Sequence, residues 1–416
     1  MFLKKITLTH FKCLANIELS FAQSPSENRK WTLILGENGT GKSNLLKAIA
    51  LVTSGSSALG ELLGNTDSWI QLGQSQCTIA AELQTKKGEV RHIALQIHRG
   101  DNLANIMANN IDSLRLIDEA LNHADRNYFV VAYGASRRLS GDVFSGFDTS
   151  RNSRSSNVRN LFDNSTSLNP LAAWAIDLDY RSGEAGLSII KNALQDFLPG
   201  ITFHAINKEH KQLLFQTVDG IVALEQLSDG YQNMAAWIGD LLFRVTETFK
   251  DFNDPLLARG LLLIDEIDLH LHPRWQRKLL AFIGDKLPNF QVVATTHSPL
   301  TAQQADSGEL FALKRNADNL VEVVPFNGSP KALLVNQLLM SPVFGLKSDE
   351  SYAVSQAKVA YQALMLKGDT LGADDSKQLK AVKKTLQLNL PQRDSLATEK
   401  ELALLAKLEA SLNIAE

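Results

Sequence analysis

The chain of 416 residues contains only two cysteines, Cys13 and Cys77, and no CxxC pair. So few cysteines exclude a disulfide scaffold and a cysteine-based zinc hook, and they favour a reducing, cytoplasmic compartment. No apolar run reaches membrane-spanning length, and residues 1–6 are typical of a strand rather than of a signal peptide. The formal net charge of −3 argues against a uniformly basic protein that coats nucleic acid, although 42 lysines and arginines could still form a local basic stripe.

The most specific motif that the chain does contain is a glycine-rich segment between an apolar strand and a helix. Residues 36–43 read GENGTGKS, which matches GxxxxGK[ST] and is flanked by the strand and the helix that this motif requires. The glycines let backbone N–H groups surround a phosphate, Lys42 supplies a charge to the β/γ-phosphates, and the Ser43 hydroxyl suits Mg²⁺. We therefore predict that ATP and Mg²⁺ are bound by Gly36, Glu37, Asn38, Gly39, Thr40, Gly41, Lys42, Ser43 and Asn44.

Two later strands end in polar residues that suit the same site. Residues 259–266 read RGLLLIDE, an apolar run ending in Asp265 and Glu266. A strand that delivers an acid at its carboxyl end suits Mg²⁺ binding, and the second acid suits polarisation of the attacking water. The next apolar strand ends at His297, which could contact the γ-phosphate or could simply be a satisfied histidine at a strand end. The predicted catalytic residues are Glu266, His297 and Lys42, and the predicted metal ligands are Ser43 and Asp265.

The order of the motifs indicates a class of ATPase. A long insertion separates the P-loop from the acid strand, and residues 227–232 read LSDGYQ just before an apolar helical stretch. This hexapeptide resembles the LSGGQ signature of ABC-type ATPases, in which the signature of one protomer closes over the γ-phosphate bound to the other. The resemblance implies that Ser228 and Gly230 act in trans, on ATP bound by a second copy of the chain.

More broadly, the chain resembles the SMC/RecF/OLD-type branch of ABC ATPases, and within it the stand-alone ATPase subunits of bacterial antiphage systems, Septu-type and retron-associated. The resemblance covers residues 1 to about 330. It implies an α/β fold, an ABC-type P-loop NTPase with a mixed sheet, an antiparallel β lobe, a helical insertion and a helical C-terminal tail. The supporting segments, besides the motifs above, are Ile6–Lys12, Tyr128–Arg138, Glu266–Pro273 and Thr295–Pro299.

Three features depart from the ABC pattern. Asp229 stands where the common signature has glycine; its carboxylate would repel the neighbouring nucleotide if it faced inward, and it is harmless if it faces outward. The segment that replaces the Q-loop has no glutamine, and Ser136 or Arg137 is the candidate substitute. His270 and His272 form a His-x-His pair, for which a role at a dimer interface is favoured over zinc because the sequence offers no third ligand nearby.

We divide the chain into four parts. Residues 1–138 form an N-terminal ABC lobe with the P-loop, 139–200 a loop and helical insertion, 201–330 a C-terminal ABC lobe with the signature, the acid strand and His297, and 331–416 a helical tail. The Arg-rich stretch Ser150–Arg159 is predicted to be a loop that either contacts nucleic acid or is merely solvated. Because a long heptad array is absent, an SMC-style coiled-coil arm is absent or reduced to this insertion.

The tail is expected to contain helices over Ser351–Lys367, Ser376–Leu390 and Thr398–Leu412. These helices could form a docking platform for a partner or pack on their own core, and amphipathicity alone does not separate the two. The tail is too short for the Toprim nuclease of OLD proteins, so any nuclease must come from another chain.

The function that we predict is ATP hydrolysis by a homodimer or higher oligomer that closes around ATP and controls a partner effector, a nuclease, in antiphage defence. The effector is implied by the resemblance alone, and no membrane partner is expected. One alternative is a RecF-like DNA-repair ATPase that acts directly on nucleic acid. Another is a nucleotide-sensing scaffold with little turnover, which the missing Q-loop glutamine favours.

Overall fold

The computed structural model divides the chain into two compact units, Met1–Gly345 and Leu346–Glu416. The boundary follows Gly345, whereas the sequence places the start of the tail at residue 331. Residues 138–152, which include Arg138 and part of the expected insertion, and the expected helix Thr398–Leu412 lie outside the described residues. The structure describes residues 2–24, 27–85, 88–122, 129–137, 153–169, 171–198, 200–249, 255–346, 348–366 and 373–388.

The first unit is built around a six-stranded sheet in the order β15-β14-β5-β13-β12-β8. All neighbouring strands pair in parallel except β15, which is antiparallel to β14. The inner strands are short apolar runs because a parallel sheet covered on both faces has no side facing water. Leu262 therefore packs into the core on one face and its neighbour Leu263 into the core on the other. The strands are β5 (Trp31–Gly36), β8 (Phe129–Tyr133), β12 (Gly260–Ile264), β13 (Phe290–Thr295), β14 (Leu310–Arg315) and β15 (Val321–Pro325).

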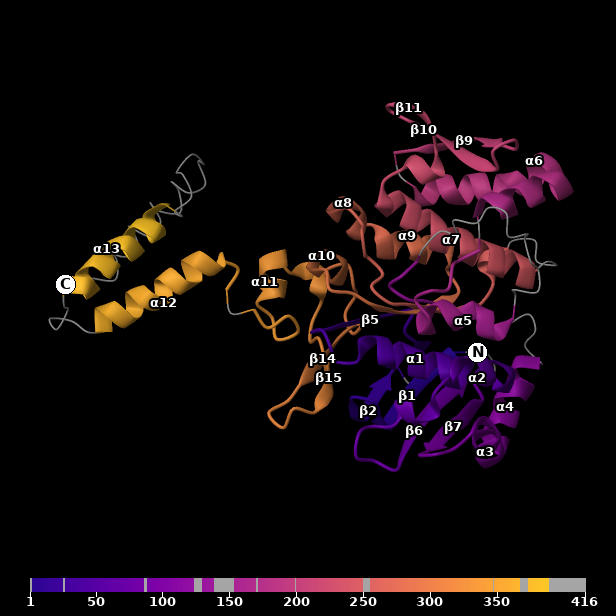
Figure 1. Cartoon of the computed structure of the whole chain (residues 1–416), viewed down its shortest axis with the longest axis horizontal. Helices are drawn as coiled ribbons and strands as arrows, with labels where there is room; N and C mark the ends of the chain where they lie inside the picture. The colour runs from indigo at the N-terminus through magenta and orange to yellow at the C-terminus, as the bar shows by residue number, and fades with distance from the viewer. Residues whose placement is uncertain are drawn as a thin grey trace. The chain divides into compact units, whose positions relative to one another are not determined.

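An antiparallel lobe covers one face of this sheet, with helix α1 (Lys42–Thr53) packed between the two layers (Figure 1). The lobe has the strand order β2-β1-β6-β7 and buries alternate residues of β6, as a half-buried strand requires. Its strands are β1 (Phe2–Phe11), β2 (Leu14–Ser20), β6 (Gln76–Gln84) and β7 (Val90–His98). The accompanying elements are β3 (Ala22–Ser24), β4 (Glu27–Asn28), α2 (Ser56–Leu62), η1 (Thr66–Trp69), α3 (Leu103–Asn109) and α4 (Ile111–Asn122).

Helices cover the other face of the sheet, and a small antiparallel sheet, β11-β10-β9, packs beside α6 (Figure 1). Helix α7 buries an unbroken run from Met234 to Val245, and α6 is kinked at Gly183, whose φ is 56°. The α/β fold with a mixed sheet and an antiparallel lobe, which the sequence predicts, is confirmed. The elements are α6 (Leu171–Phe197), β9 (Thr202–Asn207), β10 (Gln212–Thr217), β11 (Gly220–Ala223), η3 (Leu224–Gln226), α7 (Asp229–Thr248), η4 (Pro255–Leu257), α8 (Pro273–Gln276), α9 (Leu279–Lys286), α10 (Pro299–Ala302), η5 (Pro330–Ala332) and α11 (Val335–Leu339).

One local expectation is wrong. The described part of the predicted loop Ser150–Arg159 is instead the start of helix α5 (Arg154–Phe162). Ser153 caps this helix: its hydroxyl accepts from the Ser156 N–H at 3.1 Å, and the Ser156 hydroxyl accepts from the Ser153 N–H at 2.9 Å. The serines that made the segment look like a loop therefore form a capping box, and Val158 and Leu161 anchor the helix in the core.

The second unit contains helices α12 (Tyr352–Leu366) and α13 (Ala373–Leu388), which pack against each other. They correspond to two of the three helices expected in the tail. Ala357 and Leu364 of α12 are buried, and Lys358 pairs with Glu350. Among the residues that the structure describes, in either unit, none of the helices combines the length and the apolar character needed to cross a bilayer.

Candidate functional site

The P-loop follows β5 and turns directly into α1. Gly39 and Gly41 have φ of 80° and 94°, which L side chains rarely adopt, and a Cβ on Gly36 would lie 2.7 Å from the Leu313 carbonyl oxygen. Gly41 is the N-cap of α1 and offers no side-chain cap, so the N–H groups of the first turn are open to an anion. The Thr40 hydroxyl closes the loop by donating to the Glu37 carbonyl at 2.8 Å.

Lys42 is buried at the first position of α1. Its ammonium donates to the Gly36 carbonyl at 2.7 Å and to the Glu37 carbonyl at 2.9 Å, so it lies across the loop that would hold a phosphate. Burial lowers the pKa of Lys42, and the carboxylates of Asp265 and Glu266 partly offset that effect. The lysine is therefore a desolvated cation, and an anion held there would be attracted more strongly than at an exposed lysine.

Ser43 and Asp265 are far apart in the sequence but adjacent in the structure. The Ser43 hydroxyl donates to Asp265 Oδ2 at 2.6 Å, and the Thr295 hydroxyl donates to Asp265 Oδ1 at 2.6 Å. Asp265 comes directly after β12, and Thr295 ends the neighbouring β13. Two hard oxygen groups beside a phosphate-binding loop fit Mg²⁺: Ser43 would give a hydroxyl ligand and Asp265 a carboxylate ligand, with water and phosphate oxygens as the others.

Glu266, half-buried, has a left-handed backbone with φ of 49°. Its N–H donates to the Thr295 hydroxyl at 2.8 Å, and its carbonyl accepts from Arg137 Nη2 at 2.6 Å. Arg137 belongs to the segment after β8, where the sequence lacks a Q-loop glutamine. The sequence named Arg137 only as one of two candidate substitutes, and it carried no signal for a contact with Glu266.

His297 follows β13 and is exposed. It lines a cavity of about 410 Å³ together with Gly36, Glu37 and Thr40 of the P-loop. The cations Lys314 and Arg315 at the end of β14 also line this cavity, and Arg315 Nη2 donates to the Gly39 carbonyl at 3.2 Å. The structure thus places His297 beside the P-loop and adds two cations that sequence reasoning missed.

The signature segment forms the start of α7. Ser228 is the N-cap, but its hydroxyl makes no cap hydrogen bond to the helix, and Asp229 beside it is exposed. A Cβ on Gly230 would lie 2.8 Å from the His270 carbonyl oxygen, so this position requires glycine for close packing.

His272 Nδ1 accepts from the Arg274 N–H at 3.2 Å, which makes it the cap of α8. Within the described ranges, no group of three or more His, Cys, Asp or Glu residues could hold a metal.

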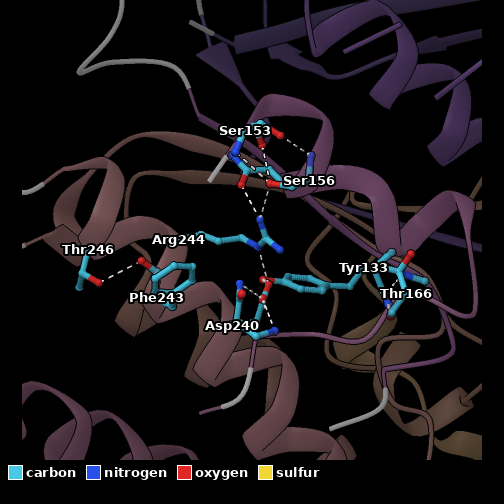
Figure 2. Close-up of polar contacts among 12 residues, drawn as sticks. Tyr133, Ser153, Ser156, Thr166, Asp240, Phe243, Arg244 and Thr246 are labelled. Atoms are coloured by element: carbon cyan, nitrogen blue, oxygen red, sulfur yellow. Dashed lines mark hydrogen bonds and ion pairs between the residues drawn. The ribbon is translucent and has the colours of Figure 1, made fainter. Parts of the chain in front are cut away.

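A buried polar network ties the signature helix to the central sheet (Figure 2). Asp240 of α7 accepts from the Tyr133 hydroxyl at 2.9 Å and from Arg244 Nε at 2.6 Å. Its other oxygen accepts from the N–H and the amide of Asn169 at 2.9 and 2.7 Å. Arg244 Nη1 reaches Asn157 of α5 at 2.7 Å. Only the i,i+4 spacing of Asp240 and Arg244 could have been noticed in the sequence.

Replacing Arg244 with methionine is expected to destabilise the protein by about 3–5 kcal/mol, because it leaves the Asp240 carboxylate buried without its cation. Denaturant unfolding of the whole chain measures the change in the free energy of unfolding. The matched control is Arg115→Met, which breaks the exposed i,i+4 pair with Glu119. That pair should contribute less than about 1 kcal/mol. Equal losses in the two variants would contradict a stabilising role for the buried network.

Comparisons with known proteins place the chain among ATPase families. The family described as "AAA domain, putative AbiEii toxin, Type IV TA system" matches residues 78–302, and the family described as "AAA ATPase domain" matches residues 1–132. The chain is 27% identical to Septu protein PtuA of Bacillus mycoides (strain KBAB4) over 83% of this chain and 45% of that protein. It is 22% identical to the Retron Vc95 probable ATPase of Vibrio cholerae serotype O1 biovar El Tor, over 92% of this chain and 86% of that relative.

Among solved structures, an Smc head bound to the C-winged helix domain of ScpA aligns with 17% identity and a TM-score of 0.46, over 79% of this chain and 98% of that one. The Septu and retron relatives confirm the resemblance that the motif order indicates. The chain spans less than half of the PtuA protein that it matches, 45% of its length.

Proposed function

The chain belongs to the AAA-domain family described as "AAA domain, putative AbiEii toxin, Type IV TA system", and we propose that it hydrolyses ATP at its P-loop. One observation carries the proposal: the Ser43 hydroxyl lies 2.6 Å from Asp265 Oδ2. Lys42 directly precedes Ser43, and Glu266 directly follows Asp265. A phosphate loop, a magnesium-binding acid and an adjacent carboxylate are the parts that phosphoryl transfer to water requires.

In the proposed reaction the uncapped N-terminus of α1 and Lys42 bind the β- and γ-phosphates of ATP. Mg²⁺, when bound at Ser43 and Asp265, would neutralise the charge that develops on the phosphate oxygens. Glu266 orients the attacking water and accepts its proton, while His297, exposed next to the P-loop, contacts the γ-phosphate.

We further propose that the site is completed by the signature of a second copy of the chain. The Ser228 hydroxyl is not used to cap its own helix, and Gly230 allows this helix end to pack against His270. An exposed helix N-terminus whose serine hydroxyl does not cap the helix is suited to an anion supplied by another protomer. Closure of the two copies around ATP would then control a separate effector, a nuclease, in antiphage defence, which is what the similarity to Septu-type and retron-associated ATPases suggests.

The experiment that tests hydrolysis is phosphate release by the purified chain with ATP and Mg²⁺, alongside sedimentation with and without ATP. Turnover that depends on Mg²⁺, with an ATP-dependent dimer, supports the proposal. Tight ATP binding without turnover would favour the nucleotide-sensing scaffold, and turnover that requires added DNA would favour a RecF-like role.

Ser228→Arg is expected to abolish the ATP-dependent dimer while the monomer still binds ATP. The large side chain would occupy the space in which a helix N-terminus must approach a phosphate, whereas the P-loop itself is unchanged. Sedimentation with ATP measures the dimer, and a fluorescent ATP analogue measures binding. The control is Ser75→Arg, which places the same side chain at another exposed serine, just before β6. If Ser228→Arg dimerises as readily as Ser75→Arg does, the signature does not act in trans.

A further inference from the structure

Arg137 is a fully buried arginine whose hydrogen bonding is incomplete. It is 2% exposed and follows β8 at the carboxyl edge of the sheet. Its Nη2 donates to the Glu266 carbonyl at 2.6 Å, but its Nε and Nη1 are buried and have no hydrogen-bond partner among the described residues. Each buried donor left unpaired costs about 1–3 kcal/mol, so the position is unfavourable for an arginine that serves stability alone.

Arg244, the buried arginine of the polar network, differs from Arg137 in its hydrogen bonding. Arg244 donates through Nε to Asp240 and through Nη1 to Asn157, so its charge is paired and its donors are used. In the part of the chain that the structure describes, Arg137 instead donates to a backbone carbonyl, and it lies near the carboxylates of Asp265, Asp268 and Glu266. Burial lowers the pKa of Arg137 to about 10, so the guanidinium stays charged at neutral pH.

The carbonyl that Arg137 holds belongs to a strained residue. Glu266 has φ of 49°, and a non-glycine residue in this region costs about 1 kcal/mol or more unless its surroundings impose the conformation. Both ends of the residue are held: Thr295 accepts from the N–H at 2.8 Å, and Arg137 donates to the carbonyl at 2.6 Å. These two anchors determine the direction in which the Glu266 side chain leaves the backbone.

We propose that Arg137 is a positioning residue for ATP hydrolysis: by holding the Glu266 carbonyl it keeps the left-handed backbone that directs the Glu266 carboxylate toward the attacking water. It occupies the segment in which the Q-loop glutamine is missing. The inference rests on the hydrolysis proposed above. It predicts a loss in kcat and little change in ATP binding, because the hydrogen bond that the structure gives Arg137 goes to Glu266 and not to the P-loop.

The test compares Arg137→Met with Arg29→Met in the full chain. Arg29 is also a buried arginine that donates to backbone carbonyls, those of Gly308 and Ser20. It precedes β5, however, and so lies at the amino ends of the parallel strands, away from the P-loop. Arg137→Met should lower kcat by about 100-fold, the order of loss expected from a misplaced catalytic group. The KM and the Kd for ATP should stay close to the wild-type values. Arg29→Met should lose thermal stability but keep the wild-type kcat.

Arg137→Lys is the second variant, and it tests the positioning role of Arg137 even if Arg137→Met does not fold. Lysine keeps the charge and one donor but has a shorter, single-point contact, so kcat should fall by about tenfold with KM retained. A kcat in both folded variants as high as that of Arg29→Met would overturn the inference. A loss of ATP affinity as large as the loss of kcat would overturn it too, because Arg137 would then bind phosphate. Absence of turnover in the wild type would instead refute the proposed hydrolysis itself.

Discussion

Lys42→Ala is expected to weaken ATP–Mg²⁺ binding by at least about 100-fold and to reduce turnover below detection. The lysine is the buried cation of the P-loop, and its ammonium lies 2.7 and 2.9 Å from the two carbonyls that begin the loop. Each hydrogen bond from such a cation to a phosphate contributes about 1.5–3 kcal/mol, so two of them correspond to this loss of affinity. Equilibrium binding of a fluorescent ATP analogue measures the effect.

The matched control for this variant is Lys30→Ala. Lys30 also donates to a backbone carbonyl, that of Gly284 at 2.6 Å, and burial also lowers its pKa. It precedes β5, whereas Lys42 follows the other end of that strand. Lys30→Ala should bind ATP as the wild type does. If the two variants lose affinity equally, the effect comes from general destabilisation and the P-loop assignment fails.

Glu266→Gln is expected to lower kcat by about 10² to 10⁴-fold while ATP remains bound. Glutamine keeps the size of the side chain but cannot accept the proton of the attacking water, which is the contribution of a general base. Because the P-loop is unchanged, ATP should accumulate unhydrolysed and hold two protomers together. Single-turnover measurements of phosphate release give the rate, and sedimentation with ATP gives the amount of trapped dimer.

The control for Glu266→Gln is Glu309→Gln, which makes the same change at a half-buried glutamate just before β14, at the opposite edge of the sheet. Its kcat should equal that of the wild type. Turnover by Glu266→Gln at the wild-type rate would exclude Glu266 as the base. If turnover falls as expected but no trapped dimer forms, the result would support Glu266 as the general base and contradict the proposed closure of two copies around ATP.

Much of the candidate site could be predicted from the sequence because its parts are local. The P-loop is one continuous segment, and glycines at 39 and 41 permit the positive φ that a phosphate-binding turn needs. The acid strand is an apolar run with its carboxylates at the end, and parallel strands bring their carboxyl ends to one edge of the sheet. The meeting of Ser43 with Asp265 follows from these two patterns together.

Other parts of the site and fold could not be predicted in this way. The stretch around Ser153 has the composition of a loop, and only the contacts of Val158 and Leu161 with the core make it a capped helix. Lys314 and Arg315 lie at the end of a strand with no motif of their own, yet the strand order places them beside the P-loop.

By itself, the sequence determined which residues are candidates for phosphate, magnesium and water, and which segment is the candidate signature. These properties depend on residue type and on spacing along one strand, turn or helix. Only the tertiary structure decided which carbonyl Arg137 contacts and which groups bind Asp240 besides the nearby Arg244, since Glu266 is far from Arg137 in the sequence, and Tyr133 and Asn169 are far from Asp240. Such contacts depend on which strands are neighbours and on how side chains pack between them, and no local pattern encodes either.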